Sequence, residues 1–320
     1  MCRRPAFVTS ILVPKLGPIL GPILGLVLAL AGCSGAVIEA VAPSAPRAPT
    51  GSVPGHVYLL RGLVGEVFSL GFYDLSLRIK ERGINASVHS MYAPGSLANE
   101  IIASYRRAPA PIALIGHSSG ADAAISVAGQ LRAANVPVAL MFGFDPTPIA
   151  GRVPDNVEVF INLYQKTNLI GGGEARGVTG FRGRIVNVDL RDRREIIHIT
   201  LDKSPVLHRL VADKIALTFR ARVQPPVPSP SRGRQTHAVA PAAYVTPLSM
   251  RYVVPPDVPI VLWDSAVRGV IGADETLDVF AARMAAPPWA IASINNVSSA
   301  APPVSGSALL VPRSIGDASR

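Results

Sequence analysis

The stretch Ile112–Gly120, IALIGHSSG, constrains the fold of this chain more than any other. Its four leading apolar residues predict a buried parallel strand, and residues 121–134 predict a helix. Between them lies G-x-S-x-G, a pattern that has meaning in a strand–turn–helix context and otherwise recurs by chance. We expect Gly116 and Gly120 where a side chain would clash between strand and helix. The turn strains the serine backbone and projects its hydroxyl, and the helix N-terminus favours an anion there, so we predict Ser118 as a nucleophile.

Apolar runs alternate with helical patterns from residue 55 to residue 222. Several of these runs are continuous, which favours strands covered on both faces. We therefore expect an α/β fold with an open, mostly parallel sheet, helices on both faces and no large lid. The predicted strands are 57–60, 86–91, 112–115, 136–144, 157–163 and 185–190, and the predicted helices are 72–82, 96–107, 121–134 and 205–219.

The amino-terminal segment has the features of a targeting sequence. Arg3, Arg4 and Lys15 precede an apolar stretch that two prolines interrupt, which makes it a poor membrane span. It ends Leu-Ala-Gly-Cys at Cys33, which resembles the bacterial lipobox. This resemblance implies a signal peptide over residues 1–32, a lipidated Cys33 and a tether over residues 33–54. The expected location is the bacterial cell envelope, with the protein held on a membrane and facing the periplasm or the cell exterior.

The carboxyl-terminal third reads as weakly structured. Residues 223–256 are rich in proline, serine and alanine and predict a linker. Residues 257–320 predict a poorly structured extension that contains one strand at 258–263 and one helix at 274–284.

Composition and charge exclude several kinds of partner. The net charge is +10, but the basic residues are scattered, so we expect an affinity for anionic envelope surfaces and no nucleic-acid binding. We find no metal-ligand set, phosphate loop or dinucleotide fingerprint, and we expect no metal and no cofactor. The oligomeric state stays open.

A serine nucleophile needs a base and an orienting acid. The GHSSG elbow and the strand order around it resemble the α/β-hydrolase superfamily, close in layout to small lipase- and thioesterase-like members, over residues 55 to about 222. The resemblance implies the chain order serine, acid, histidine. It therefore implies a triad of Ser118, Asp145 and His198, in which each residue follows a different predicted strand.

Alternatives remain for two members of the triad. Most such hydrolases carry the acid one strand later, where this chain offers Glu174 behind three glycines. Asp122 is nearer to the serine in sequence, but an acid in the first turn of a helix is ordinary dipole compensation. His208 is the rival base, and its place inside a predicted helix favours a packing role.

The resemblance also implies an oxyanion hole made of backbone N–H groups. One is Ser119, and the other is Leu63 or its neighbour, in a loop that reads Arg61-Gly62 where many relatives have His-Gly. An open site lined by apolar side chains suits an acyl chain. The expected rim is Leu63, Val64, Phe68, Leu169 and Ile170.

Three functions follow from this reading. The first is a lipid-anchored serine hydrolase that cleaves a small acyl ester or thioester through an acyl-enzyme on Ser118. The second is a hydrolase-like envelope protein that binds or supports without catalysis, and the third is an acyltransferase. The sequence leaves the substrate and its acyl length open.

Overall fold

The computed structural model describes residues 52–63, 69–223, 244–298 and 303–315. The predicted signal peptide, most of the tether and Cys33 lie outside the described residues, as do Val64 and Phe68 of the expected rim.

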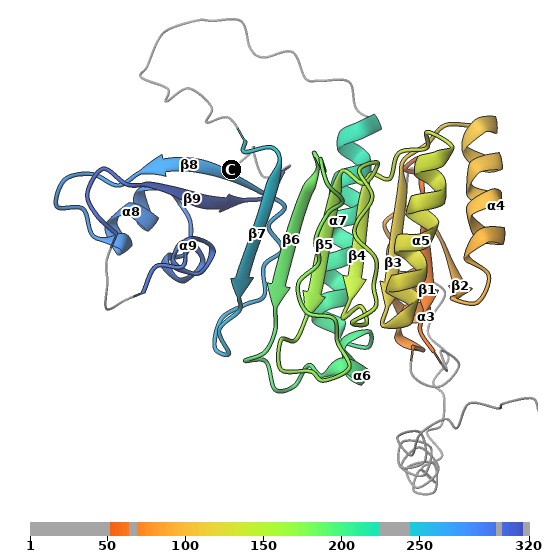
Figure 1. Ribbon diagram of the computed structural model, residues 1–320, viewed down its shortest axis with the longest axis horizontal. Coiled ribbons are helices and arrows are strands. Elements are labelled where there is room, and N and C mark those ends of the chain that lie inside the picture. Colours follow the sequence, from red (N-terminus) through yellow and green to blue (C-terminus); the bar gives the residue numbers. More distant parts are fainter. Residues whose placement is uncertain (1–51, 64–68, 224–243, 299–302, 316–320) are drawn as a thin grey trace, which may run out of the picture. The chain divides into compact units, whose positions relative to one another are not determined.

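The described strands include seven that form one parallel sheet, in the order β2-β1-β3-β4-β5-β6-β7 (Figure 1). The expected open parallel sheet is therefore confirmed. Strands β3, β4 and β5 are buried along their whole length, as their continuous apolar runs predict. The strands are β1 (His56–Arg61), β2 (Asn85–Ser90), β3 (Ile112–His117), β4 (Leu140–Phe144), β5 (Val159–Tyr164), β6 (Arg184–Asp189) and β7 (Leu248–Val253).

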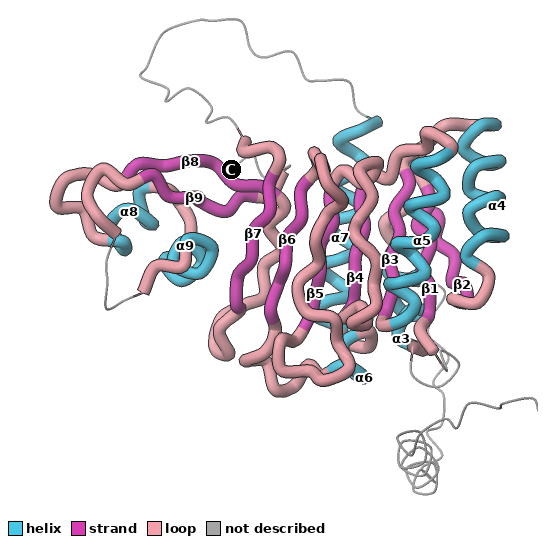
Figure 2. The backbone as a smooth tube through the Cα atoms, in the orientation of Figure 1, coloured by secondary structure: helices cyan, strands magenta, loops and turns pink. Residues whose placement is uncertain are grey.

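Helices cover both faces of this sheet. Helices α4 (Pro94–Arg107) and α5 (Ser119–Ala133) pack on one face, and α3 (Gly71–Lys80) and α7 (Pro205–Val223) pack on the other (Figure 2). Each face has its own apolar core, with Ile101 and Leu131 in the first and Leu75 and Ile215 in the second.

The connections place a topological switch point between β1 and β3. The chain runs from β1 outward to β2 and then returns to β3 on the other side of β1. Ligands of open α/β sheets bind at such a point, beyond the carboxyl ends of the strands. Here Gly62 and Leu63 follow β1, and Ser118 follows β3.

The prediction for the carboxyl-terminal third is wrong except for its helix, which is present within the expected range 274–284. Residues 224–243 of the predicted linker lie outside the described residues. Residues expected to form a linker contain β7, which adds a parallel seventh strand to the sheet beside β6. Residues expected to be poorly structured form the antiparallel pair β8 (Ser265–Val270) and β9 (Ala308–Arg313), with α8 (Leu277–Arg283) and α9 (Pro288–Asn295). The strand expected at 258–263 is irregular backbone. Aromatic packing explains why this region is ordered, because Trp263 and Trp289 pack against each other and against Tyr252 of β7.

Candidate functional site

Ser118 sits in the sharp turn between β3 and α5. Its backbone angles are φ 55° and ψ −129°, a conformation that a non-glycine residue adopts only when its surroundings impose it. The Ser118 N–H donates to the carbonyl of Phe144 on the neighbouring strand at 2.9 Å, which anchors the turn. A Cβ at Gly116 would lie 2.3 Å from the Cα of Ala121, so strand and helix approach each other as the sequence predicts.

Asp145 and His198 meet beyond the carboxyl ends of the strands. The Oδ2 atom of Asp145 lies 2.8 Å from the Nδ1 atom of His198. The Asp145 side chain is fully buried, and that of His198 is 11% exposed. Asp145 directly follows β4, has a positive φ of 49° and donates its N–H to the carbonyl of Leu163 at 2.7 Å. Two of the three predicted catalytic residues therefore form a hydrogen-bonded pair.

His198 begins the short helix α6 (His198–Leu201). The loop before it is held by the Gln165 side chain, whose Nε2 donates to the carbonyls of Ile196 and Leu190. The structure records no hydrogen bond between Ser118 Oγ and His198, and such bonds are often long in enzymes without substrate. His117, the residue before Ser118, contacts His198, with 2.9 Å between its Nε2 and the His198 carbonyl oxygen.

His117, the last residue of β3, is buried and neutral. Burial is the main cause that lowers its pKa to about 3, and the nearby His198 lowers it further. Its Nε2–H therefore donates to the His198 carbonyl, and its Nδ1 accepts from the Ser69 hydroxyl at 2.8 Å. Both ring nitrogens are occupied, which fits a supporting role and not that of a base.

The structure does not bring the alternative residues to His198. Glu174 pairs with Arg251, with 3.2 Å between Oε1 and Nε. Asp122 binds the backbone N–H and the hydroxyl of Thr147. His208 is buried in α7, with its Nε2 2.5 Å from the carbonyl oxygen of Asp202.

The expected oxyanion donors lie at the switch point. Ser119 is the first residue of α5, where backbone N–H groups have no partner within the helix. The Leu63 N–H donates to the Oγ atom of Ser119 at 2.7 Å. The Leu63 N–H would have to give up this hydrogen bond before it could bind an oxyanion. The role of Leu63 in the oxyanion hole therefore stays a prediction.

One residue of the site escaped the sequence analysis. Asn168, in the loop after β5, places its Nδ2 atom against Asp145 Oδ2 and 3.0 Å from His198 Nδ1. No motif marks such a residue, because its contacts depend on how the loops after β4 and β5 meet. Only its place in the same loop as Glu174 could have drawn attention to it.

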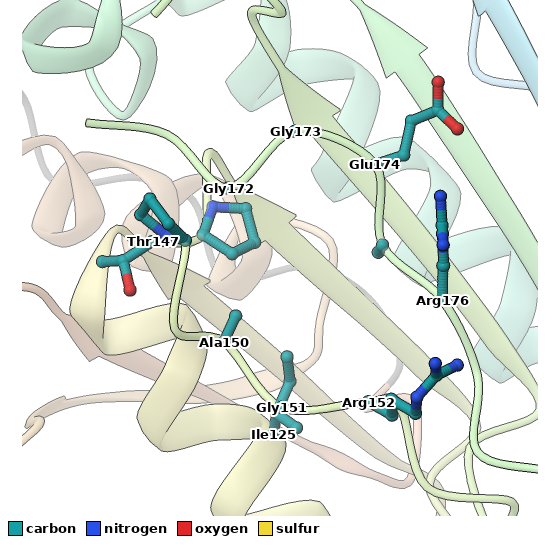
Figure 3. Close-up of a pocket in the computed structure, with 12 residues that line it drawn as sticks. Ile125, Thr147, Ala150, Gly151, Arg152, Gly172, Gly173, Glu174 and Arg176 are labelled. Atoms are coloured by element: carbon teal, nitrogen blue, oxygen red, sulfur yellow. The ribbon is translucent and has the colours of Figure 1, made fainter. Parts of the chain in front are cut away.

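A pocket of about 210 Å³ opens between the loops after β4 and β5 (Figure 3). Thr147 and Arg152 line it from one loop, and Gly172 and Arg176 line it from the other. None of the three predicted catalytic residues lines this pocket, so we assign it no part in catalysis.

Two further properties concern the described part of the chain only. No group of three or more histidine, cysteine, aspartate or glutamate residues there has the arrangement to hold a metal ion. None of the helices described is both long and apolar enough to cross a membrane.

No protein-family model matches the sequence, and no curated protein matches it closely. Solved structures similar to this chain include the RedJ thioesterase of the prodiginine biosynthetic pathway in Streptomyces coelicolor, at 20% identity and a TM-score of 0.24. That match covers 35% of this chain, which spans only about half (48%) of the thioesterase. Human thioesterase 2 is 13% identical with a TM-score of 0.35, over 54% of this chain and 99% of that one. A putative α/β-superfamily hydrolase of Xanthomonas campestris is 16% identical with a TM-score of 0.32, over 53% and 99%.

All of these TM-scores are low, so the chain's own geometry carries the assignment. Its strand order, the serine turn after β3 and the position of His198 after β6 give it an α/β-hydrolase fold.

Proposed function

We propose that this protein is a serine hydrolase that cleaves carboxylic esters or thioesters through an acyl-enzyme on Ser118. The observation that carries the proposal is the hydrogen bond of 2.8 Å between buried Asp145 and His198, at strand ends close to a strained serine turn. Buried carboxylates are costly to maintain. A carboxylate held against an imidazole at this edge of the sheet is therefore best explained by what it does for the histidine.

The proposed mechanism assigns one role to each residue. Asp145 accepts the Nδ1–H of His198, which leaves Nε2 unprotonated and able to take the hydroxyl proton of Ser118. The Ser118 oxygen attacks the substrate carbonyl, and the N–H of Ser119 stabilises the resulting oxyanion. His198 then protonates the departing alcohol or thiol. Water, activated by the same histidine, releases the acid and restores the serine.

The residues around the site favour a substrate with an apolar acyl group. Leu63, Leu169 and Ile170 follow the ends of β1 and β5 and are 61%, 96% and 56% exposed. Tyr92, Ile197 and Ile199, in the loop after β2 and around the start of α6, are exposed too. Large exposed apolar side chains gathered around one edge favour an apolar ligand over a charged one.

The proposal includes a membrane anchor. Its support is the lipobox-like sequence that ends at Cys33, outside the described residues. A lipidated cysteine followed by a tether would keep the hydrolase at the surface of a bacterial membrane.

A fluorophosphonate probe tests the catalytic part of the proposal. The wild-type chain should be labelled and should hydrolyse p-nitrophenyl esters, and Ser118→Ala should lose both, with a fall in kcat on the order of 10⁴-fold or more. Ser126→Ala, an exposed serine on α5, is the matched control and should keep both. Activity that survives Ser118→Ala would refute the assignment. A folded wild-type chain without labelling would favour a binding role.

A further inference from the structure

The loop after β5 closes over the carboxylate of Asp145. The Gly172 N–H donates to the Pro146 carbonyl at 2.5 Å, which ties this loop to the one after β4. A Cβ at Gly171 would lie 2.2 Å from Asp145 Oδ1, so only glycine allows so close an approach. Gly171 and Gly172 therefore let this loop approach Asp145 and the loop after β4, and we call residues 168–172 the acid clamp.

The amide of Asn168 has a defined orientation in this clamp. Its Oδ1 accepts the N–H of Ile170 at 3.2 Å, which directs the NH₂ group to Asp145. Its Nδ2 then donates to Asp145 Oδ2, the same oxygen that faces His198 Nδ1. One carboxylate oxygen thus accepts from both the amide and the imidazole.

Asp145 depends on these two donors. Its side chain is fully buried, and Oδ1 has no hydrogen-bond partner among the described residues. A buried carboxylate with too few hydrogen-bond donors is costly to keep in place. The Asn168 amide is therefore half of the side-chain hydrogen bonding that holds the Asp145 carboxylate beside His198.

We infer that Asn168 is a positioning residue that holds the Asp145 carboxylate on His198, and that position 168 can itself carry the orienting carboxylate. The inference rests on the proposed hydrolase function. Its second half follows from distance, since the atom at the end of the Asn168 side chain already lies 3.0 Å from His198 Nδ1. Aspartate has the same shape as asparagine and would place an oxygen there.

Kinetics of the full chain test the first half. Asn168→Ala should lower kcat for p-nitrophenyl esters by about 10²-fold, because a misplaced catalytic group costs about that much, and should leave KM nearly unchanged. Thr167→Ala, an exposed neighbour in the same loop, is the control and should keep wild-type kcat. Wild-type kcat in a folded Asn168→Ala variant would overturn the inference.

An exchange of the two side chains tests the second half. Asp145→Asn alone should lose about 10⁴-fold in kcat. The double variant Asp145→Asn/Asn168→Asp should regain at least about tenfold, because the carboxylate and the amide have only traded places within reach of His198. A merely structural Asn168 predicts no recovery, and a double variant as inactive as Asp145→Asn would overturn this half.

A third measurement needs no catalysis. In full-length Ser118→Ala, the proton NMR signal of His198 Nδ1–H should appear far downfield, and adding Asn168→Ala should shift or abolish it, whereas adding Thr167→Ala should not. An unchanged signal would refute the positioning role. If the wild-type chain neither labels nor hydrolyses esters, the proposed function fails, and this signal still decides whether Asn168 holds the pair.

Discussion

Backbone strain marks two of the proposed catalytic residues. Ser118 and Asp145 both have a positive φ, 55° and 49°, although neither is glycine. Each is fixed by an N–H that donates to a carbonyl of the next strand along the sheet, Phe144 for Ser118 and Leu163 for Asp145. Such conformations cost roughly 1–3 kcal/mol each and persist where the surroundings over-determine them. The strain here directs two side chains to one edge of the sheet.

Substitution of Asp145 and of Glu174 tests which of them orients His198. Asp145→Asn should lower kcat by about 10⁴-fold, because the amide no longer stabilises the imidazolium or fixes the tautomer of His198. Glu174→Gln should change kcat little, because Glu174 is paired with Arg251 and not with His198. Steady-state kinetics on p-nitrophenyl esters measure both. The reverse ranking of the two variants would move the acid to Glu174 and leave Ser118 in place.

The sequence predicted those residues of the site that a motif or a strand end marks. Ser118 carries a local motif, and Asp145 and His198 could be placed because each follows a strand that its apolar run predicts. Asn168 could not be found, because its role arises where two loops far apart in sequence close on each other. No pattern in the three glycines before Glu174 predicts a contact, yet Gly171 approaches Asp145 more closely than a residue with a Cβ could.

Among the secondary-structure elements, the prediction from composition failed at β7, a strand at the edge of the sheet. Strand β7 alternates buried residues with exposed or half-buried ones and follows a proline- and serine-rich stretch, so it lacks the continuous apolar run of β3 or β5. Its partner strand β6 and the aromatic residues that pack beside it supply its order. These contacts are long-range and cannot be read from the local sequence.

A buried ion pair joins this carboxyl-terminal region to helix α7. Lys214 Nζ lies 2.8 Å from Asp264 Oδ2, with side chains only 5% and 4% exposed. Asp264→Ala should lower the free energy of unfolding by about 3–5 kcal/mol, because it leaves a buried ammonium without this carboxylate. Urea denaturation measures the change. Asp278→Ala, an exposed acid on α8, should stay within about 0.5 kcal/mol of wild type. A small effect of Asp264→Ala would mean that this ion pair contributes little to the stability of the protein.

For the whole molecule, attachment and catalysis should be separable. The catalytic residues all lie between Ser118 and His198, and the proposed anchor lies at Cys33, before residues 33–54. A chain of that length spans at most about 75 Å, so an anchored enzyme would work within that distance of its membrane. The scattered basic residues behind the net charge of +10 would favour the same anionic surface.

Substitution of the anchor cysteine tests this arrangement. Cys33→Ser should move the protein from the membrane fraction to the soluble fraction, because the several acyl chains that hold a bacterial lipoprotein on its membrane would no longer be attached. The kcat on short esters should not change. Cys2→Ser, within the predicted signal peptide, should stay with the membranes and serves as the control. Fractionation, with mass spectrometry of the mature amino terminus, measures both. A mature terminus elsewhere than residue 33, or a Cys33→Ser variant that remains membrane-bound, would show that the chain is held in another way.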